Sequence, residues 1–328
     1  MKFAVYGCRH YHIESAAAEL LKLGYGCAGA FENKGPQIGR LIREHGFETL
    51  ENSDALFAKK PDIVLCGAVN DEKIDVIEDC AAHGVDIMLD KPLVTSMKDY
   101  LRLENVVKAG KIKVGMMLTE RFNPPVYTLK QLIDEGKIGT LVSCTFDKPH
   151  KLTPSTRESW HFDRRQNGGP VVDLMIHDFD LIRWFTGSEV KKASGYIRKG
   201  DREGYPQLCD DAKVLTVMEN GVTSSMSADW WTPDAYATFG KGHIVCTGTG
   251  GKAEAFSTGE PAINGEPGVV LLSTAAEPQK IIPCRVPGRC LMEDFIALER
   301  GEKSIISQND VLAATKASLK ADENCETL

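Results

Sequence analysis

Short apolar runs alternate with longer stretches of helical periodicity over about the first 120 residues. Each apolar run has the length of a buried strand, and each stretch between them is long enough for a helix. This alternation is typical of a parallel sheet with crossover helices, and we predict a doubly wound α/β domain over residues 1–120. The predicted strands are Lys2–Gly7, Cys27–Phe31, Ile63–Cys66, Asp86–Leu89 and Lys113–Met117, the last of which we expect to be the sixth of the sheet.

The predicted helices carry recognisable start and stop signals. Ser96 is placed to cap one helix, and Gly46 and Gly84 are placed to end two others. Apolar residues three or four apart mark one face of each helix. The four helices are expected at Ile13–Leu23, Gln37–His45, Asp71–His83 and Ser96–Ala109.

The pattern changes after Arg121. A helix at Pro125–Glu135 and a strand at Leu141–Phe146 precede an irregular polar segment, Lys148–Asn167, and a single helix is predicted over Val171–Phe185. Alternating strands follow at Val190–Ile197, Ala212–Glu219 and Val222–Asp229.

Asn220-Gly221 predicts a type I′ hairpin between the last two of these strands, and two helices close the chain. We expect residues 121–328 to form an α+β domain with a mostly antiparallel open sheet. The last helix is expected to pack back on the N-terminal domain.

Composition narrows the class of protein. Apolar residues make up 42% of the 328 and charged residues 26%, as in globular domains, and the net charge of −7 gives no basic face for nucleic acid. No apolar run reaches the length of a membrane span, and the chain runs from Met1 directly into a core strand. The ten cysteines are scattered without C-x-x-C spacing, which favours reduced thiols over disulfides or metal ligands. We expect a soluble cytoplasmic protein.

The turn after the first strand is a candidate phosphate cradle. Gly7 supplies the tight turn, and Arg9, His10 and Tyr11 follow it before a helix N-terminus. The second and third glycines of G-x-G-x-x-G are missing, so a plain strand–helix turn explains the segment equally well.

Three further positions suit a dinucleotide. Glu32 stands at the end of the second strand, where an acid accepts from the adenosine ribose hydroxyls and disfavours a 2′-phosphate. Ala68 and Asn70 follow the strand Ile63–Cys66, where small residues permit close approach of a cofactor. The alternative is a surface acid and an ordinary loop.

Lys91, in Asp90-Lys91-Pro92, lies at the carboxyl end of a buried strand, from which it can donate to a substrate hydroxyl. Asp173 and His177 are spaced i, i+4 on one predicted helix face, and an imidazole there suits proton transfer at neutral pH. A helix-face hydrogen bond is the simpler interpretation of that pair. Two such groups without a third ligand do not make a metal site, and we expect none.

Taken together, these residues resemble the Gfo/Idh/MocA family, named for glucose–fructose oxidoreductase, inositol dehydrogenase and rhizopine catabolism. Asp90-Lys91-Pro92 resembles the family's E-K-P motif, and Gly168-Gly169-Pro170 running on to His177 resembles its G-G-G-x-x-x-D-x-x-x-H stretch. The segments Arg121–Pro124 and Gly248–Gly251 are also similar. The glycine turn, the acid of E-K-P and Lys73 in place of a histidine depart from the family pattern.

The resemblance implies NAD(P)-dependent hydride transfer at a ring hydroxyl of a sugar, cyclitol or related polyol, with NAD the expected cofactor. It implies a catalytic group of Lys91, Asp173 and His177, and homodimers or homotetramers paired through the sheet of the second domain. We expect substrate contacts from His150, Trp160, Asp173 and His177. The expected cofactor contacts are Gly7, Arg9, His10, Tyr11, Glu32, Ala68, Asn70, Asp90, Lys91 and Arg121.

Two other functions are considered, of which the first would use the same residues, whereas the set of Lys91, Asp173 and His177 speaks against the second. An enzyme that retains and recycles NAD could cleave glycosidic bonds by oxidation and elimination. A cofactor-free sugar-binding regulator would account for the degenerate glycine turn.

Overall fold

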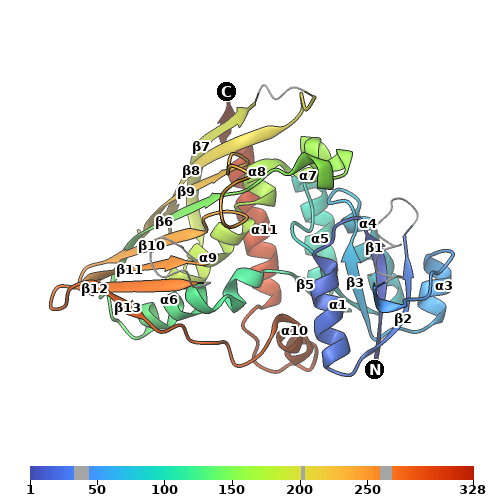
Figure 1. Cartoon of the computed structure of the whole chain (residues 1–328). Coiled ribbons are helices and arrows are strands. Elements are labelled where there is room, and N and C mark those ends of the chain that lie inside the picture. The colour runs from blue at the N-terminus through green and yellow to red at the C-terminus, as the bar shows by residue number, and fades with distance from the viewer. Residues whose placement is uncertain (33–43, 201–203, 259–267) are drawn as a thin grey trace. The chain divides into compact units, whose positions relative to one another are not determined.

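The computed structural model describes residues 1–32, 44–200, 204–258 and 268–328. The chain divides into two compact units (Figure 1). The first unit comprises Met1–Leu118, Arg165–Gly168 and Arg289–Thr315. The second unit comprises Thr119–Arg164, Gly169–Gly288 and Lys316–Leu328. Most of the helix expected at Gln37–His45 lies outside the described residues.

The first unit is built on a parallel sheet in the order β2-β1-β3-β4-β5. The order reverses at β1 and β3, the switch point beside which ligands bind in open α/β sheets. The predicted strands are confirmed, but among the described residues Val114–Met116 is the fifth strand of a five-stranded sheet rather than the sixth. The bounds are β1 (Lys2–Cys8), β2 (Gly26–Phe31), β3 (Ile63–Gly67), β4 (Asp86–Leu89) and β5 (Val114–Met116).

Helices of the first unit end where the sequence signals predict. Ser96 Oγ accepts from the Asp99 N–H at 3.2 Å, and Gly84 and Gly110 take positive φ as C-caps. A short helix, α3, was not predicted. The helices are α1 (Ile13–Lys22), α3 (Ser53–Ala58), α4 (Lys73–His83), α5 (Met97–Ala109) and α10 (Leu291–Glu299).

The second unit carries a nine-stranded sheet in the order β13-β12-β11-β10-β6-β9-β8-β7-β14. Only the pairs β6/β9 and β14/β7 are parallel among these strands, which confirms a mostly antiparallel sheet. The bounds are β6 (Leu141–Pro149), β7 (Val190–Lys199), β8 (Cys209–Met218), β9 (Thr223–Asp229), β10 (His243–Gly248), β11 (Gly251–Phe256), β12 (Val269–Thr274), β13 (Lys280–Ile282) and β14 (Cys325–Thr327).

One face of this sheet is covered by helices. Along β8, Ala212, Val214 and Met218 are buried while Leu215 between them is exposed, the alternation of a sheet covered on one side. Figure 1 shows α6, α8 and α9 on the covered side. The helical segments that include residues of this unit are α6 (Pro124–Asp134), α7 (Arg164–Asn167), α8 (Gly169–Asp173), α9 (Ile176–Thr186), α11 (Gln308–Glu323), and the 3₁₀ turns Thr119–Phe122, Pro154–Thr156 and Ser159–Phe162.

Two local predictions were wrong. The single helix expected over Val171–Phe185 is two helices, because the N–H groups of Leu174 and Met175 both bond to Pro170 O and the chain turns there. The hairpin at Asn220-Gly221 exists, but only Gly221 of the two has positive φ (+89°), whereas a type I′ turn needs both.

Of the helices in the described ranges, none combines the length and the apolar character needed to cross a membrane.

Candidate active site

The turn between β1 and α1 is shaped by Gly7. Its φ is +84°, and a Cβ there would lie 2.7 Å from the Cβ of Ala68. The His10 N–H donates to Gly67 O at 2.8 Å. The small residues Gly67 and Ala68 at the end of β3 are therefore packed against the β1–α1 turn.

Glu32 lies beside the same turn. It directly follows β2, and its Oε2 accepts a hydrogen bond of 2.9 Å from the Cys8 N–H. A carboxylate at this position of a doubly wound sheet is suited to the ribose hydroxyls of a dinucleotide.

A buried lysine connects the ends of β3 and β4. Lys73 is fully buried, and its Nζ donates to Asn70 Oδ1 and Asp90 O, each at 2.8 Å, and to Pro92 O at 3.0 Å. Asn70 Nδ2 in turn donates to Asn167 O at 2.9 Å. One ammonium group thereby donates hydrogen bonds to the main chain on both sides of Lys91.

Two histidines of the turn contact the carboxylate of Asp90. His10 Nδ1 lies 2.5 Å from Asp90 Oδ2, and His12 Nδ1 lies 3.2 Å from Asp90 Oδ1. The two imidazole rings meet edge to face with centroids 4.1 Å apart. Asp90 is 1% exposed, so its charge is screened little by water.

Burial lowers the pKa of His10 to about 4, against the opposing effect of Asp90. Burial alone would raise the pKa of Asp90, but His10 and His12 outweigh it and hold that pKa well below its usual range. At neutral pH the cluster therefore pairs an ionised carboxylate with a neutral His10 imidazole.

Lys91 follows Asp90 directly and is buried, and Tyr11 at the rim of the turn is half exposed and stacks on His10 with ring centroids 5.1 Å apart. Arg9 is partly buried. The first unit thus places the predicted cofactor residues from the turn, β2, β3 and β4 at the carboxyl edge of its sheet.

Asp173 and His177 belong to the second unit. Asp173 is the last residue of α8 and His177 the second of α9, so the turn at Leu174–Met175 separates them. The prediction that they share the face of one continuous helix was therefore wrong. Asp173 is buried, and His177 is partly exposed.

An ion cluster lies next to His177 along the chain. Lys148 Nζ is 3.0 Å from Asp178 Oδ1 and 3.6 Å from Glu120 Oε1, and Lys148 and Asp178 are buried. Burial, only partly offset by Lys148, raises the pKa of Asp178 to about 6. This cluster was not foreseen, since its members are distant in sequence.

Arg121 is buried and makes a bidentate pair with Asp180, Nε to Oδ2 at 2.8 Å and Nη2 to Oδ1 at 2.6 Å. Its guanidinium also lies over the ring of Trp184, 5.3 Å from the centroid. The guanidinium is thus paired inside the second unit, and its expected contact with the cofactor stays a prediction.

His150 and Trp160 lie in the segment before α8. His150 contacts the rings of Trp230 and Phe239 edge to face, and Trp160 is buried and stacked on His161. They form aromatic packing in the second unit. Their expected contact with substrate stays a prediction.

Sequence reasoning assigned no role to Lys73 and left His12 out of the site. Lys73 is the first residue of α4 and lies three residues after Asn70, across the turn that leads into this helix. The i, i+2 spacing of His10 and His12 was visible, but Asp90 is 78 residues further on and only the fold brings it to them.

Comparison with known proteins agrees with this architecture. Residues 1–117 match the model of an oxidoreductase family with an NAD-binding Rossmann fold, and residues 126–254 match a GFO/IDH/MocA C-terminal domain. A solved protein of Erwinia carotovora atroseptica SCRI1043, described as a candidate oxidoreductase, superposes with a TM-score of 0.91 at 21% identity, covering 100% of this chain and 99% of its own.

Curated relatives match part of this chain. The rhizopine catabolism protein MocA of Rhizobium meliloti is 26% identical over 51% of this chain and 54% of its own. The scyllo-inositol 2-dehydrogenase (NAD(+)) of Bacillus subtilis is 24% identical over 68% of this chain and 65% of its own. The matches span about half the length of the curated relatives. Family models match both parts of the chain, and the chain belongs to the Gfo/Idh/MocA family of oxidoreductases.

Proposed function

We propose that this protein transfers hydride between NAD and a ring hydroxyl of a sugar, cyclitol or related polyol. The observation that carries the proposal is the presence of Lys91, Asp173 and His177 in a chain that matches both models of the family. The curated relatives named for inositol support a cyclitol as substrate class.

The chain's own groups divide the acid–base work. His177 takes the hydroxyl proton, and Asp173 orients the imidazole or a substrate hydroxyl. Lys91 donates to the reacting oxygen and stabilises its developing negative charge. The nicotinamide, when bound, supplies the hydride acceptor.

The first unit offers a fitting place for the dinucleotide. Gly7 gives the tight turn, and the Glu32 carboxylate stands beside it at the end of β2. Glu32 supports NAD over NADP, because a carboxylate there repels a 2′-phosphate. Because the second and third glycines of the phosphate-binding turn are missing, side chains must contribute to binding the pyrophosphate. Arg9 would supply a positive charge for it.

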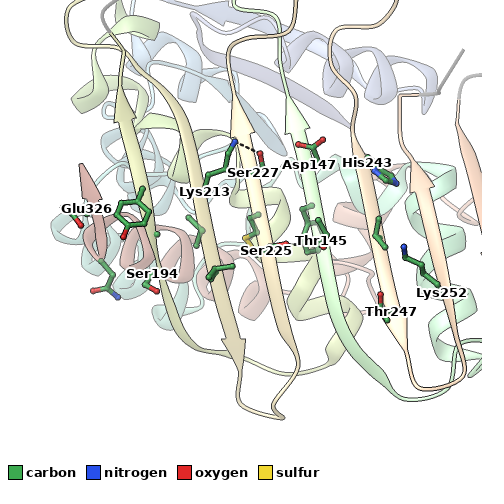
Figure 2. Close-up of a pocket in the computed structure, with 18 residues that line it drawn as sticks. Thr145, Asp147, Ser194, Lys213, Ser225, Ser227, His243, Thr247, Lys252 and Glu326 are labelled. Carbon is green, nitrogen blue, oxygen red and sulfur yellow. Dashed lines mark hydrogen bonds between the residues drawn. The ribbon is translucent and has the colours of Figure 1, made fainter. Parts of the chain in front are cut away.

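We also propose that two or four copies associate through the uncovered face of the large sheet. A hollow on this face is lined among others by Tyr196 and Leu215. Figure 2 draws its lining residues, with Lys213 among those labelled. Tyr196 on β7 is 52% and Leu215 on β8 64% exposed, which leaves large apolar side chains exposed on this face. A second copy of the same face would remove them from water.

A reducing compartment such as the cytoplasm suits the chain. All ten cysteines are free thiols, and those of Cys144 and Cys246 are hydrogen-bonded at 3.4 Å on neighbouring strands without forming a disulfide.

The test is a fluorescence titration of the purified protein with NADH and with NADPH, followed by assays of NADH formation from NAD with myo-inositol, scyllo-inositol and a panel of sugars. We expect NADH to bind at least tenfold more tightly than NADPH. Glu32→Gln should narrow that difference, because it removes the charge that opposes the 2′-phosphate.

Two results would redirect the proposal. If neither dinucleotide binds and the denatured protein releases none, the protein is a cofactor-free sugar-binding module. If glycosides are cleaved with no net change in the cofactor, the NAD-recycling elimination replaces net oxidation.

A further inference from the structure

We propose that His10, His12 and Asp90 form a binding site for one divalent transition-metal ion, with Zn²⁺ as the ion of best fit. The site lies wholly in the first unit, between the β1–α1 turn and the end of β4. It goes beyond the proposed hydride transfer and does not depend on it.

The three side chains converge as ligands do. One donor atom from each can be chosen so that all lie within 4.8 Å of one another. A tetrahedral ion with bonds of about 2.0–2.1 Å spaces its donors by about 3.3 Å. His12 Nδ1 lies 3.2 Å from Asp90 Oδ1, which matches this spacing. His10 Nδ1 lies 2.5 Å from the other oxygen of the same carboxylate, Oδ2, and that pair must open by less than about 1 Å.

Two of the three proposed ligands are buried and held in place, and the third is accessible to solvent. Asp90 and His10 are buried, and the main chain of each is bonded to the end of β3: the Asp90 N–H donates to Cys66 O at 3.0 Å and the His10 N–H to Gly67 O at 2.8 Å. The side chain of His12 is 39% exposed, so an ion can enter and the imidazole can swing toward it. Three protein ligands with an open side are typical of a site that keeps one coordination position for water or a ligand.

The donor set selects the kind of ion. Two imidazoles and one carboxylate suit Zn²⁺ and neighbouring first-row ions, whereas Mg²⁺ and Ca²⁺ prefer oxygen ligands throughout. Lys91 follows Asp90 directly, and an ion held here would lie beside the residue that we place on the reacting oxygen.

The alternative is that the two histidines only donate hydrogen bonds to Asp90 and fasten the turn. The same contacts serve both interpretations, and only metal affinity separates them. The sequence predicted no metal site because it offers no set of ligands close together in the chain. Asp90 lies 78 residues after His12, and only the fold brings the two together.

The experiment uses the full chain after treatment with a chelator and dialysis. Zn²⁺ is titrated in competition with a chromophoric chelator, Co²⁺ binding is followed by its visible absorption, and bound metal per chain is measured by mass spectrometry. We expect one ion per chain with a dissociation constant of about 1 μM or tighter, no competition from millimolar Mg²⁺, and a Co²⁺ spectrum of low coordination number.

His12→Gln should weaken Zn²⁺ binding by about 100-fold, and so should Asp90→Asn, which keeps the shape of the side chain. His83→Gln is the matched control, because His83 is an exposed histidine of the same unit outside the cluster. The proposal is overturned if Zn²⁺ does not bind below about 100 μM, or if it binds the His12 and Asp90 variants as tightly as the wild type. Circular dichroism of each variant separates lost ligands from lost fold.

Discussion

The Nζ of Lys73 donates a hydrogen bond of 2.8 Å to the main-chain oxygen of Asp90, the residue directly before Lys91. With a second bond to Pro92 O, the ammonium holds the chain on both sides of Lys91. A lysine without exposed surface is uncommon, and its position is explained by the acceptors that surround it. Lys73 is therefore a positioning residue for Lys91.

Lys73→Met should lower kcat at least tenfold, because the side chain of Lys91 is no longer held in position. The KM for the polyol should change less, because the other proposed substrate contacts are unaltered. Each buried acceptor left without a donor also costs about 1–3 kcal/mol, so the unfolding midpoint in urea should fall. Lys98→Met, at an exposed position of α5, is the control and should change neither. A Lys73 variant that loses stability but keeps kcat would limit this residue to a structural role.

The pair Arg121–Asp180 gives a prediction about stability. Asp180→Asn leaves a buried guanidinium without its counter-charge, which typically costs about 3–5 kcal/mol and should lower the urea midpoint. The double variant Arg121→Met/Asp180→Leu should recover much of the loss, since neither charge is then buried. NADH affinity of the folded double variant should equal that of the wild type. A tenfold loss of NADH affinity in the double variant would instead support the contact between Arg121 and the cofactor that the sequence predicts.

Glu299 near the end of α10 predicts a pH dependence. Burial first, and then the charge of Asp86, raises the pKa of this carboxyl from its ordinary 4.5 to about 8. Between about pH 4.5 and pH 8, the folded state therefore keeps a proton on this carboxyl that the unfolded chain has released. The stabilisation is complete below about pH 4.5 and is lost as the pH rises through about 8.

Glu299→Gln removes this dependence. Between pH 5 and 9 the melting temperature of the wild type should fall relative to that of Glu299→Gln, and thermal scans across this range measure the difference. Glu302→Gln, at an exposed position in the loop that follows α10, is the control. Parallel curves for wild type and Glu299→Gln would mean that the carboxyl is ionised in the folded protein.

The uncovered sheet face predicts an effect on assembly. Leu215→Glu places a charge within the proposed subunit contact and should convert the assembly to monomers, as measured by light scattering after gel filtration. Val286→Glu changes an equally apolar side chain, 75% exposed in the loop after β13, and should leave the mass unchanged. A wild type that is monomeric at micromolar concentration would contradict the proposed association.

Much of the fold could be predicted from periodicity. Strands such as Ile63–Gly67 are short apolar runs whose pattern is unambiguous, and Ser96 and Gly84 mark helix ends by local chemistry. The break between α8 and α9 could not be predicted, because Leu174 and Met175 continue the apolar pattern of a helix while their N–H groups converge on one carbonyl.

The candidate site divides in the same way. Lys91 and Glu32 could be placed from the strands that they follow. The contacts among His10, His12 and Asp90, and between Lys148 and Asp178, join elements far apart in sequence, so only the folded chain brings them together. The role of Arg121 could not be decided from its chemistry alone, since a guanidinium suits a carboxylate of the protein as well as an anionic group of a ligand.

The catalytic assignment itself predicts a division between binding and turnover. Lys91→Met and His177→Asn should each reduce kcat by about 10²–10⁴-fold, the usual loss when a general acid or base is removed. NADH affinity should change much less, because the proposed dinucleotide contacts come mainly from the β1–α1 turn and Glu32. Initial rates with the best polyol and an NADH titration of the same preparations give both quantities, and Lys98→Met and His83→Asn serve as controls. If Lys91→Met and His177→Asn both retain turnover near that of the wild type, the chemistry lies on other residues, and the Lys148–Asp178–Glu120 cluster next to His177 in the chain is the first place to look for them.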